Sequence, residues 1–229
     1  MKHNPFRDLS GFELALWLTS MAVVVLSAVI SGGSDLLSSA ASLIGVTALI
    51  FVAKGYVLGQ ILTIVFAVFY GIISFHFRYY GEMITYLCIT APIAAMAVIS
   101  WLRHPNEGTH EVRTGRVSHG QLIFMIISAS AVTFGFYFVL KALGNANLIV
   151  STVSITTSYI ACYLTFLRSP YYALGYAAND VVLIVLWIAA AVSDLSCLPM
   201  TACFLMFLAN DIYGFISWRK MERRQNQQQ

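Results

Sequence analysis

The sequence predicts an all-α integral membrane protein in which two parallel three-helix repeats are joined by one linker helix (3+1+3), with one extra N-terminal helix. Three observations lead to this fold class. The chain has 229 residues, 59% of them hydrophobic and only 10% charged, whereas a soluble domain carries about 25% charged residues. Long apolar runs alternate with short polar breaks, and two pairs of short motifs recur at matched spacing.

Eight segments are long and apolar enough to cross a bilayer, which takes about 20 residues of helix. They lie near residues 12–31, 36–53, 56–76, 82–103, 119–140, 147–167, 171–193 and 197–219, and only residues 104–118 form a long polar loop between them. The first segment follows Lys2 and Arg7. It therefore also fits a cleaved signal peptide or a loosely attached interfacial helix, although Asp8 and Glu13 favour a span.

The basic residues predict the orientation, because loops on the cytoplasmic side of a membrane are enriched in Lys and Arg. With eight spans and a cytoplasmic N-terminus, all thirteen Lys and Arg residues fall on the inner side except Arg78 and Lys141. An even number of spans then places the C-terminus in the cytoplasm as well. We therefore expect a multi-pass plasma-membrane protein with both ends inside.

Two motif pairs indicate an internal repeat. Tyr56-x-Leu58-Gly59 recurs as Tyr172-x-Leu174-Gly175, and Ile99-Ser100-Trp101 recurs as Ile216-Ser217-Trp218. The predicted units are a tail and extra helix (1–35), a first repeat (36–103), a loop and linker helix (104–140), a second repeat (141–220) and a polar tail (221–229). Such repeats place a substrate site near the membrane midplane. We interpret the two tryptophans themselves as interfacial anchors.

Polar groups at membrane depth predict the position of that site, because burying an ionisable group in a membrane is costly. Asn179-Asp180 and Asn210-Asp211 lie deep in the last two spans, and one face of the seventh span carries tyrosines beside them. Aromatic planes next to amides and carboxylates suit a flat heterocycle that bears hydroxyl groups. The alternative is that these groups bond across helices and hold the bundle together. The predicted substrate site is Tyr172, Gly175, Tyr176, Asn179, Asp180, Asn210, Asp211, Gln60, Thr63, Tyr159 and Tyr163.

Two residues are candidates for gating. Pro92 lies mid-span and should kink its helix, and Trp187 continues the polar face of the seventh span. Glu82, Tyr86 and Thr90 share a face of the fourth span, where we interpret Glu82 as a solvated cap. Nothing indicates a metal, a cofactor, a nucleic-acid partner or an enzyme: the four cysteines lie in apolar runs, and no Ser/His/Asp set or phosphate-binding loop is present.

Several motifs resemble the PnuC family of bacterial nicotinamide riboside transporters. They are Leu43-Ile44-Gly45-Val46 with Val52-Ala53-Lys54-Gly55, Tyr80-Gly81-Glu82, and Asp211-Ile212-Tyr213-Gly214 with Trp218. The resemblance covers about residues 40–220. It implies the 3+1+3 fold of SWEET transporters in a bacterial inner membrane, uniport by facilitated diffusion, a nucleoside-like substrate trapped inside by a cytoplasmic kinase, and a homotrimer.

One departure from that family affects the expected substrate. The family's W-x-x-W-x-x-x-N/D is here Tyr172-x-x-Gly175-x-x-x-Asn179. Loss of an indole predicts a wider pocket, so nicotinamide riboside and other (deoxy)nucleosides are ranked level. A thiamine or riboflavin transporter of the same fold, or a proton-coupled symporter using Asp180 or Asp211, is the alternative. We expect Asn179→Ala to abolish substrate binding in a folded protein.

Overall fold

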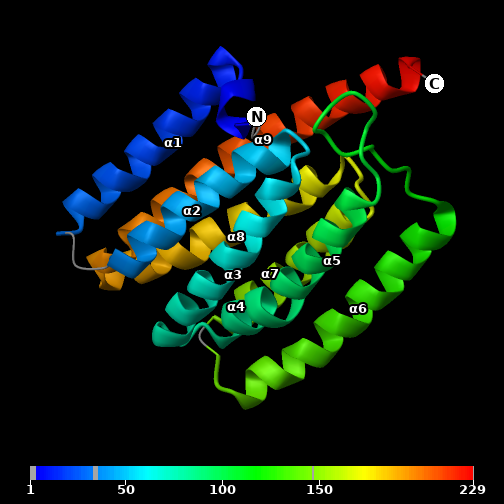
Figure 1. Ribbon diagram of the computed structural model, residues 1–229. Helices are drawn as coiled ribbons and strands as arrows, with labels where there is room; N and C mark the ends of the chain where they lie inside the picture. The colour runs from blue at the N-terminus through cyan, green and yellow to red at the C-terminus, as the bar shows by residue number, and fades with distance from the viewer. Residues whose placement is uncertain (1–3, 33–35, 146, 229) are drawn as a thin grey trace.

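A computed structural model describes residues 4–32, 36–145 and 147–228, which are mainly helical (Figure 1). Lys2 and the junction at residues 33–35 lie outside the described residues. Within them, eight spans are long and apolar enough to cross a membrane, as predicted. After a 3-10 turn, η1 (Pro5–Asp8), the first three are α1 (Gly11–Ile30), α2 (Leu36–Ala53) and α3 (Val57–His76). The fourth combines α4 (Tyr80–Ile84), η2 (Thr85–Thr90) and α5 (Ala91–Leu102). The last four are α6 (His119–Ala142), α7 (Leu148–Phe166), α8 (Tyr172–Ser193) and, after η3 (Leu195–Cys197), α9 (Leu198–Gln227).

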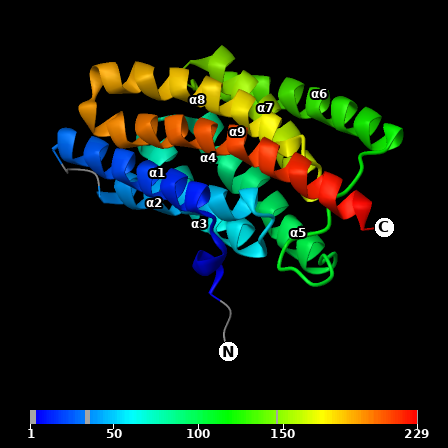
Figure 2. The same cartoon turned by 90° about the horizontal axis from the view of Figure 1, so that it is seen from above.

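The helices form one bundle whose centre is the contact between α2 and α9 (Figures 1 and 2). On one side α2 packs on α3, and α3 packs on α5; on the other, α9 packs on α8, and α8 packs on α7. Helix α6 lies at one edge and packs mainly on α7, whereas α1 lies at the opposite edge against α9 and α2. Both ends of the chain lie at the same end of the bundle (Figure 1).

The fourth span is not a regular helix. It consists of α4 (Tyr80–Ile84), a π-helical turn η2 (Thr85–Thr90) and α5 (Ala91–Leu102). Pro92 lies in the first turn of α5. Proline has no backbone N–H, so Pro92 cannot donate the usual helical hydrogen bond to the turn before it. The wider π-helical turn at that place therefore breaks no hydrogen bond that Pro92 could have made. The span is therefore irregular directly before Pro92, and the kink at Pro92 stays a prediction.

Helix α1 is bonded to the rest of the bundle. Glu13 forms an ion pair with Lys54, with 3.0 Å between Nζ and Oε2, and accepts a hydrogen bond of 2.9 Å from the Tyr213 hydroxyl. The Trp17 indole donates to Thr47 over 3.1 Å. A capping box of Ser10 and Glu13 begins the helix. These bonds fit the interpretation of the first segment as a span rather than a loosely attached helix.

The last helix is longer than predicted. Residues 221–229 were expected to be a polar tail, but α9 remains helical to Gln227. Met221 and Gln225 are only 2% and 3% exposed, because both pack beneath the loop between α5 and α6. Contacts with that loop, which the sequence pattern does not show, keep the polar end of α9 helical.

Candidate functional site

A small cavity lies between α2, α3, η2, α8 and α9. Each helix contributes residues spaced three or four apart, which share one helical face. The lining consists of Gly45, Ala48, Leu49, Val52, Gln60, Thr63, Phe66, Tyr86, Thr90, Tyr176, Asp180, Phe207 and Asp211. Both halves of the chain therefore build the cavity.

The cavity is too small for a nucleoside in this conformation. Its free volume is about 30 Å³, which is room for a water molecule or two, whereas small-molecule pockets typically measure about 300–1,000 Å³. Lining side chains must therefore move before a larger solute binds.

Two carboxyl groups supply the strongest polarity of the cavity. Asp180 of α8 and Asp211 of α9 are 2% and 3% exposed, and both line the cavity. The Oδ2 atom of each makes no hydrogen bond within the described residues, so both have acceptor capacity left. The lining residues include no Lys, Arg or His.

Aromatic rings form much of the remaining wall. Phe66 and Phe207 lie 5.2 Å apart between ring centroids, and Tyr86 meets Phe66 edge-on at 5.9 Å. Tyr176 and Asp180 are four residues apart on α8, and Phe207 and Asp211 are four apart on α9. Residues at this spacing are neighbours on a helix surface. Each of these two helices therefore presents one ring and one carboxyl group to the cavity.

Toward the end of the bundle that carries the chain termini, two tryptophans and Tyr172 close the cavity. The rings of Trp101 and Trp218 are 5.4 Å apart, and Tyr172 lies 5.0 Å from Trp218. Both indoles are buried, at 1% and 0% exposure, so their interpretation as interfacial anchors is wrong. Each donates instead to a helix end in the other half: Trp218 to the Val52 carbonyl over 2.8 Å, and Trp101 to that of Thr165 over 3.2 Å.

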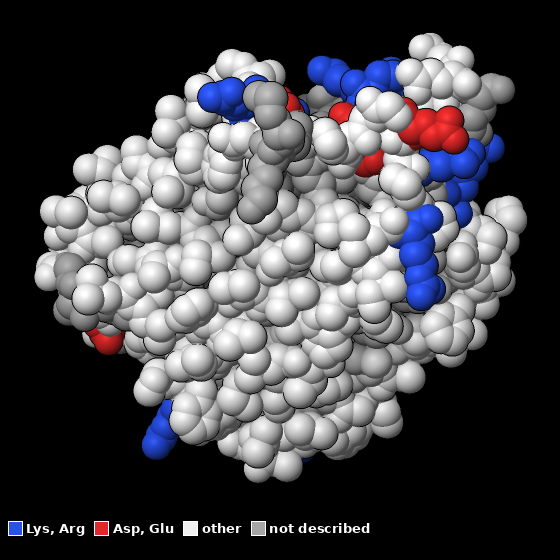
Figure 3. All heavy atoms as spheres, viewed as in Figure 1, with Lys and Arg blue, Asp and Glu red and all other residues white. Residues whose placement is uncertain are grey.

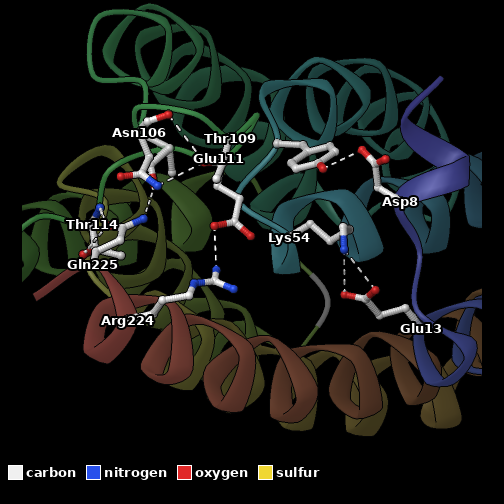
Figure 4. Close-up of polar contacts among 11 residues, drawn as sticks. Asp8, Glu13, Lys54, Asn106, Thr109, Glu111, Thr114, Arg224 and Gln225 are labelled. Carbon is white, nitrogen blue, oxygen red and sulfur yellow. Dashed lines mark hydrogen bonds and ion pairs between the residues drawn. The ribbon is translucent and has the colours of Figure 1, made fainter. Parts of the chain in front are cut away.

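Residues 103–118, called the strap below, connect α5 to α6 and bond to the end of α9 (Figure 4). The Gln225 side chain accepts from the Thr114 backbone over 2.9 Å and donates to the Val112 carbonyl over 3.1 Å. Glu111 pairs with Arg224 at 2.7 Å. The strap also donates backbone N–H groups to both halves, from Val112 to the Gly55 carbonyl and from Gly115 to the Arg168 carbonyl, each over 2.9 Å.

Beside the strap, Tyr56 donates to Asp8 over 2.7 Å. Burial of the phenol, followed by this bond to Asp8, raises the pKa of Tyr56. The hydroxyl therefore remains a hydrogen-bond donor over the physiological pH range and ties the N-terminal turn to the start of α3.

At the opposite end, a second group of aromatic residues closes the cavity. The Trp187 indole donates to the Tyr70 hydroxyl over 2.8 Å, and Phe77 and Tyr79 pack on its ring at centroid distances of 5.5 and 5.4 Å. Tyr70 in turn packs on Phe204 at 5.4 Å. Trp187 therefore lies in the closed layer beyond the cavity and not in its wall.

Five of the predicted site residues come together at the cavity: Gln60, Thr63, Tyr176, Asp180 and Asp211. The structure also places Gly45, Phe66 and Phe207 there, which sequence reasoning missed. Helical spacing was an available signal for the last two, because Phe66 lies three residues after Thr63 and Phe207 lies four before Asp211.

Two of the other predicted residues pack closely against neighbouring backbone. A Cβ atom on Gly175 would lie 2.9 Å from the Cα atom of Ala161 in α7. The missing indole has therefore left no wider pocket, since α7 occupies the space. Tyr172 is fully buried between Trp218 and Gly214.

The remaining predicted residues bond elsewhere. The Asn179 oxygen accepts from Ser154 over 3.1 Å and from Thr157 over 2.9 Å, both in α7. The Asn210 amide donates to Ser20 of α1 over 3.1 Å. Tyr159 and Tyr163 stack on each other at 6.3 Å, and the latter meets Phe124 of α6 at 6.0 Å. Asn179, Asn210 and Tyr163 thus contact neighbouring helices, and none of the four residues lines the cavity.

Glu82 is not a solvated cap. Its side chain is 0% exposed, and Oε2 accepts from Ser154 over 3.2 Å. Because Ser154 also approaches the Asn179 oxygen, Glu82 and Asn179 meet at one hydroxyl group. A buried acidic group in a span is costly, and this one belongs to a polar contact among α4, α7 and α8.

The surface fits insertion in a bilayer. Figure 3 shows a broad uncharged belt around the middle, with most of the Lys and Arg visible from this side at the end that carries the termini. Large apolar side chains such as Val29, Ile127 and Val192 are more than 60% exposed. An apolar belt of this kind matches the hydrocarbon core of a membrane.

Comparison with known proteins agrees with this architecture. A family model described as "Nicotinamide mononucleotide transporter" matches residues 35–220. A nicotinamide riboside transporter PnuC of Neisseria mucosa is 27% identical over 234 residues, covering 99% of this chain and 88% of the relative. A PnuC of Haemophilus influenzae, also called a nicotinamide riboside transporter, is 21% identical over 221 residues, covering 94% and 92%.

A solved structure shares the fold. The crystal structure of the vitamin B3 transporter PnuC superposes with a TM-score of 0.83 at 24% identity, covering 94% of both chains. Together with the family model, which spans most of the sequence, these matches show that the chain belongs to the nicotinamide mononucleotide transporter (PnuC) family of multi-pass membrane transporters, which are not enzymes.

Proposed function

We propose that the chain is a uniporter for a flat, positively charged, nucleoside-like solute, and that nicotinamide riboside is the first candidate. The observation that carries this proposal is a cavity walled by two carboxyl groups and several aromatic rings, without a basic side chain. A cationic ring is attracted electrostatically to a carboxylate and to the faces of aromatic rings. The ribose hydroxyls suit Gln60, Thr63 and the free carboxyl oxygens.

The two carboxyl groups of the cavity disfavour a phosphorylated solute. A phosphate group would bring about two negative charges next to Asp180 and Asp211, and like charges repel strongly in a low-dielectric interior. Lining residues offer no cation to offset this cost. The proposal therefore favours the riboside named for the two relatives over the mononucleotide named for the family.

Thiamine is the second candidate, because it is also a flat cation. Riboflavin and uncharged deoxynucleosides rank lower. Because they are uncharged, they are attracted less strongly to the two carboxyl groups. They also find no wider pocket, because α7 fills the space beside Gly175.

We also propose that the two halves are parallel repeats related by an axis along the membrane normal. The reciprocal bonds support this: each tryptophan near the end of a half donates to the end of the first helix of the other half. The strap bonds the corners that follow those helices, at Gly55 and Arg168. Rocking of one repeat against the other would expose the cavity to each side in turn. In this proposal the termini and the strap face the cytoplasm of a bacterial inner membrane.

Uniport, trapping by a cytoplasmic kinase and assembly as a homotrimer complete the proposal. The competing mechanism is proton symport through the carboxyl pair. Uptake into vesicles without the kinase separates the two. The membrane potential is held at zero with valinomycin and equal potassium on both sides, because a potential alone would concentrate a cationic solute. Under this condition a uniporter only equilibrates the solute, whereas accumulation driven by an imposed pH gradient and abolished by a protonophore would establish symport.

A thermal-shift screen of the purified chain tests the substrate class, because a ligand that binds the folded state raises the melting temperature. The compounds are nicotinamide riboside, nicotinamide mononucleotide, thiamine, riboflavin and a deoxynucleoside. We expect the riboside to stabilise the chain and the mononucleotide to have little effect. Replacing both carboxyl groups (Asp180→Asn with Asp211→Asn) should remove the preference for cations. Stabilisation by the mononucleotide alone would reject the proposal.

A further inference from the structure

The flat ring of a bound solute needs an aromatic partner, and the structure locates the available ones on α3, η2, α8 and α9. Positions 172 and 175 of α8 do not provide it. Tyr172 packs on Trp218 at the closed end, and α7 fills the space beside Gly175. The rings in the wall of the cavity are Phe66, Tyr86, Tyr176 and Phe207.

Phe66 is packed against other aromatic rings on several sides. It stacks on Tyr70 at 5.5 Å and 20°, meets Tyr86 edge-on at 5.9 Å and contacts Phe207 at 5.2 Å. A ring held in this way has little freedom to move, because interiors are packed to crystal density. Phe66 therefore contributes a fixed part of the wall.

Phe207 is placed differently, because the tip of its ring rests on a glycine. A Cβ atom on Gly45 would lie 2.5 Å from Cζ and 2.9 Å from Cε1 of Phe207, and at a longer 3.0 Å from Cδ2 of Phe66. No side chain at position 45 could share that space without moving the ring. Gly45 and Phe207 both line the cavity, and Asp211 follows Phe207 on the same helical face. The space beside Gly45 where a side chain would otherwise lie, called the notch below, holds the ring of Phe207. That ring therefore lies beside Asp180 and Asp211.

We propose that Phe207, seated against Gly45, is the aromatic face on which the solute's flat ring lies and the side chain that sets how much room the solute has. This inference rests on the proposed function. With the ring in its notch the cavity has about 30 Å³ of free volume. Any side chain at position 45 would displace the ring from this position in the wall of the cavity, and loss of the ring would remove the stacking face next to Asp211.

Binding measurements on three variants test the proposal. Isothermal titration calorimetry of the purified full chain with nicotinamide riboside and with thiamine reports the affinity of the folded fraction. We expect Gly45→Ala to weaken binding about tenfold, the effect of one misplaced methyl group in a pocket. Phe207→Leu should weaken it by a similar factor through loss of the aromatic face. In the double variant the shorter leucine leaves room for the methyl group, so its affinity should equal that of Phe207→Leu alone.

Gly71→Ala is the matched control. A Cβ atom at Gly71 would lie 2.6 Å from the Leu87 side chain, which is a similar steric conflict between helices, but neither residue lines the cavity. We expect this variant to lose thermal stability and keep the parental affinity. Parental affinity in both Gly45→Ala and Phe207→Leu, or equal weakening in Gly71→Ala, would overturn the inference and leave the proposed function standing. A parent chain that binds neither probe would reject both.

Discussion

At the scale of single residues, burial separates the polar side chains that face the cavity from those that hold helices together. Asp180 and Asn179 are neighbours in sequence and nearly equally buried. The carboxyl group of Asp180 nevertheless lines the cavity, whereas the Asn179 amide turns to Ser154 and Thr157. Successive residues of an α-helix are rotated by about 100°, so adjacent side chains point in different directions and contact different neighbours.

Asn179→Ala tests this distinction. The substitution removes the oxygen that accepts from Ser154 and Thr157, whereas Glu82 and backbone carbonyls of α7 remain as their other acceptors. Each lost hydrogen bond should cost about 0.5–1.5 kcal/mol. We therefore expect a lower melting temperature with ligand affinity within a few-fold of the parent, measured by thermal denaturation and calorimetry. The sequence alone predicts the opposite result, loss of binding at unchanged stability, and that result would return Asn179 to the site.

At the scale of secondary-structure elements, two segments outside the repeats are bonded to the core of the bundle. The strap joins the corners at Gly55 and Arg168 and the end of α9. The N-terminal turn η1 is joined to the start of α3 through Asp8, and helix α1 is joined to α9 through Glu13. Polar breaks in the sequence mark where such segments begin and end, but not which distant groups they bond.

Gln225→Leu tests the attachment of the strap. The change leaves the Thr114 N–H and the Val112 carbonyl without a partner, which should cost at least about 2 kcal/mol of stability and expose the loop. We expect faster proteolytic cleavage within residues 103–118 and a lower melting temperature. Gln227→Leu, an exposed residue of the same type two positions on, is the control and should behave like the parent. Equal cleavage rates in both variants would contradict the bonded strap.

Lys54→Met tests whether α1 depends on its ion pair. Glu13 has a side chain only 5% exposed, and removing the partner of a buried charge is strongly destabilising. We expect a loss of about 2 kcal/mol, less than for a fully buried pair because Lys54 is 14% exposed. Adding Glu13→Gln should restore much of the stability, since no unpaired charge remains. A double variant as unstable as Lys54→Met alone would rule out this explanation.

At the scale of the whole molecule, orientation follows from the uneven distribution of basic residues. Most lie at the end that carries both termini (Figure 3), and that end is expected to face the cytoplasm.

Cysteine labelling in intact cells tests this orientation. In a Cys88→Ser background, Glu107→Cys lies in the strap and Lys141→Cys at the end of α6, and both positions are exposed. An impermeant thiol reagent should label position 141 in intact cells and position 107 only after permeabilisation. The reverse pattern would invert the topology.

The sequence by itself determined the number of spans and the apolar belt, because crossing a bilayer imposes one requirement on length and hydropathy that every span satisfies separately. It also identified Gln60, Thr63, Tyr176, Asp180 and Asp211, whose polarity stands out in apolar helices.

Only the tertiary structure decided what apolar and small residues do. Phe66, Phe207 and Gly45 resemble any other core residues until the helices are assembled, and Gly175 suggested a wider pocket until α7 was seen to fill it. The physical reason is that helical periodicity assigns a residue to a face, whereas rotation and separation of packed helices decide whether that face meets a cavity, another backbone or lipid.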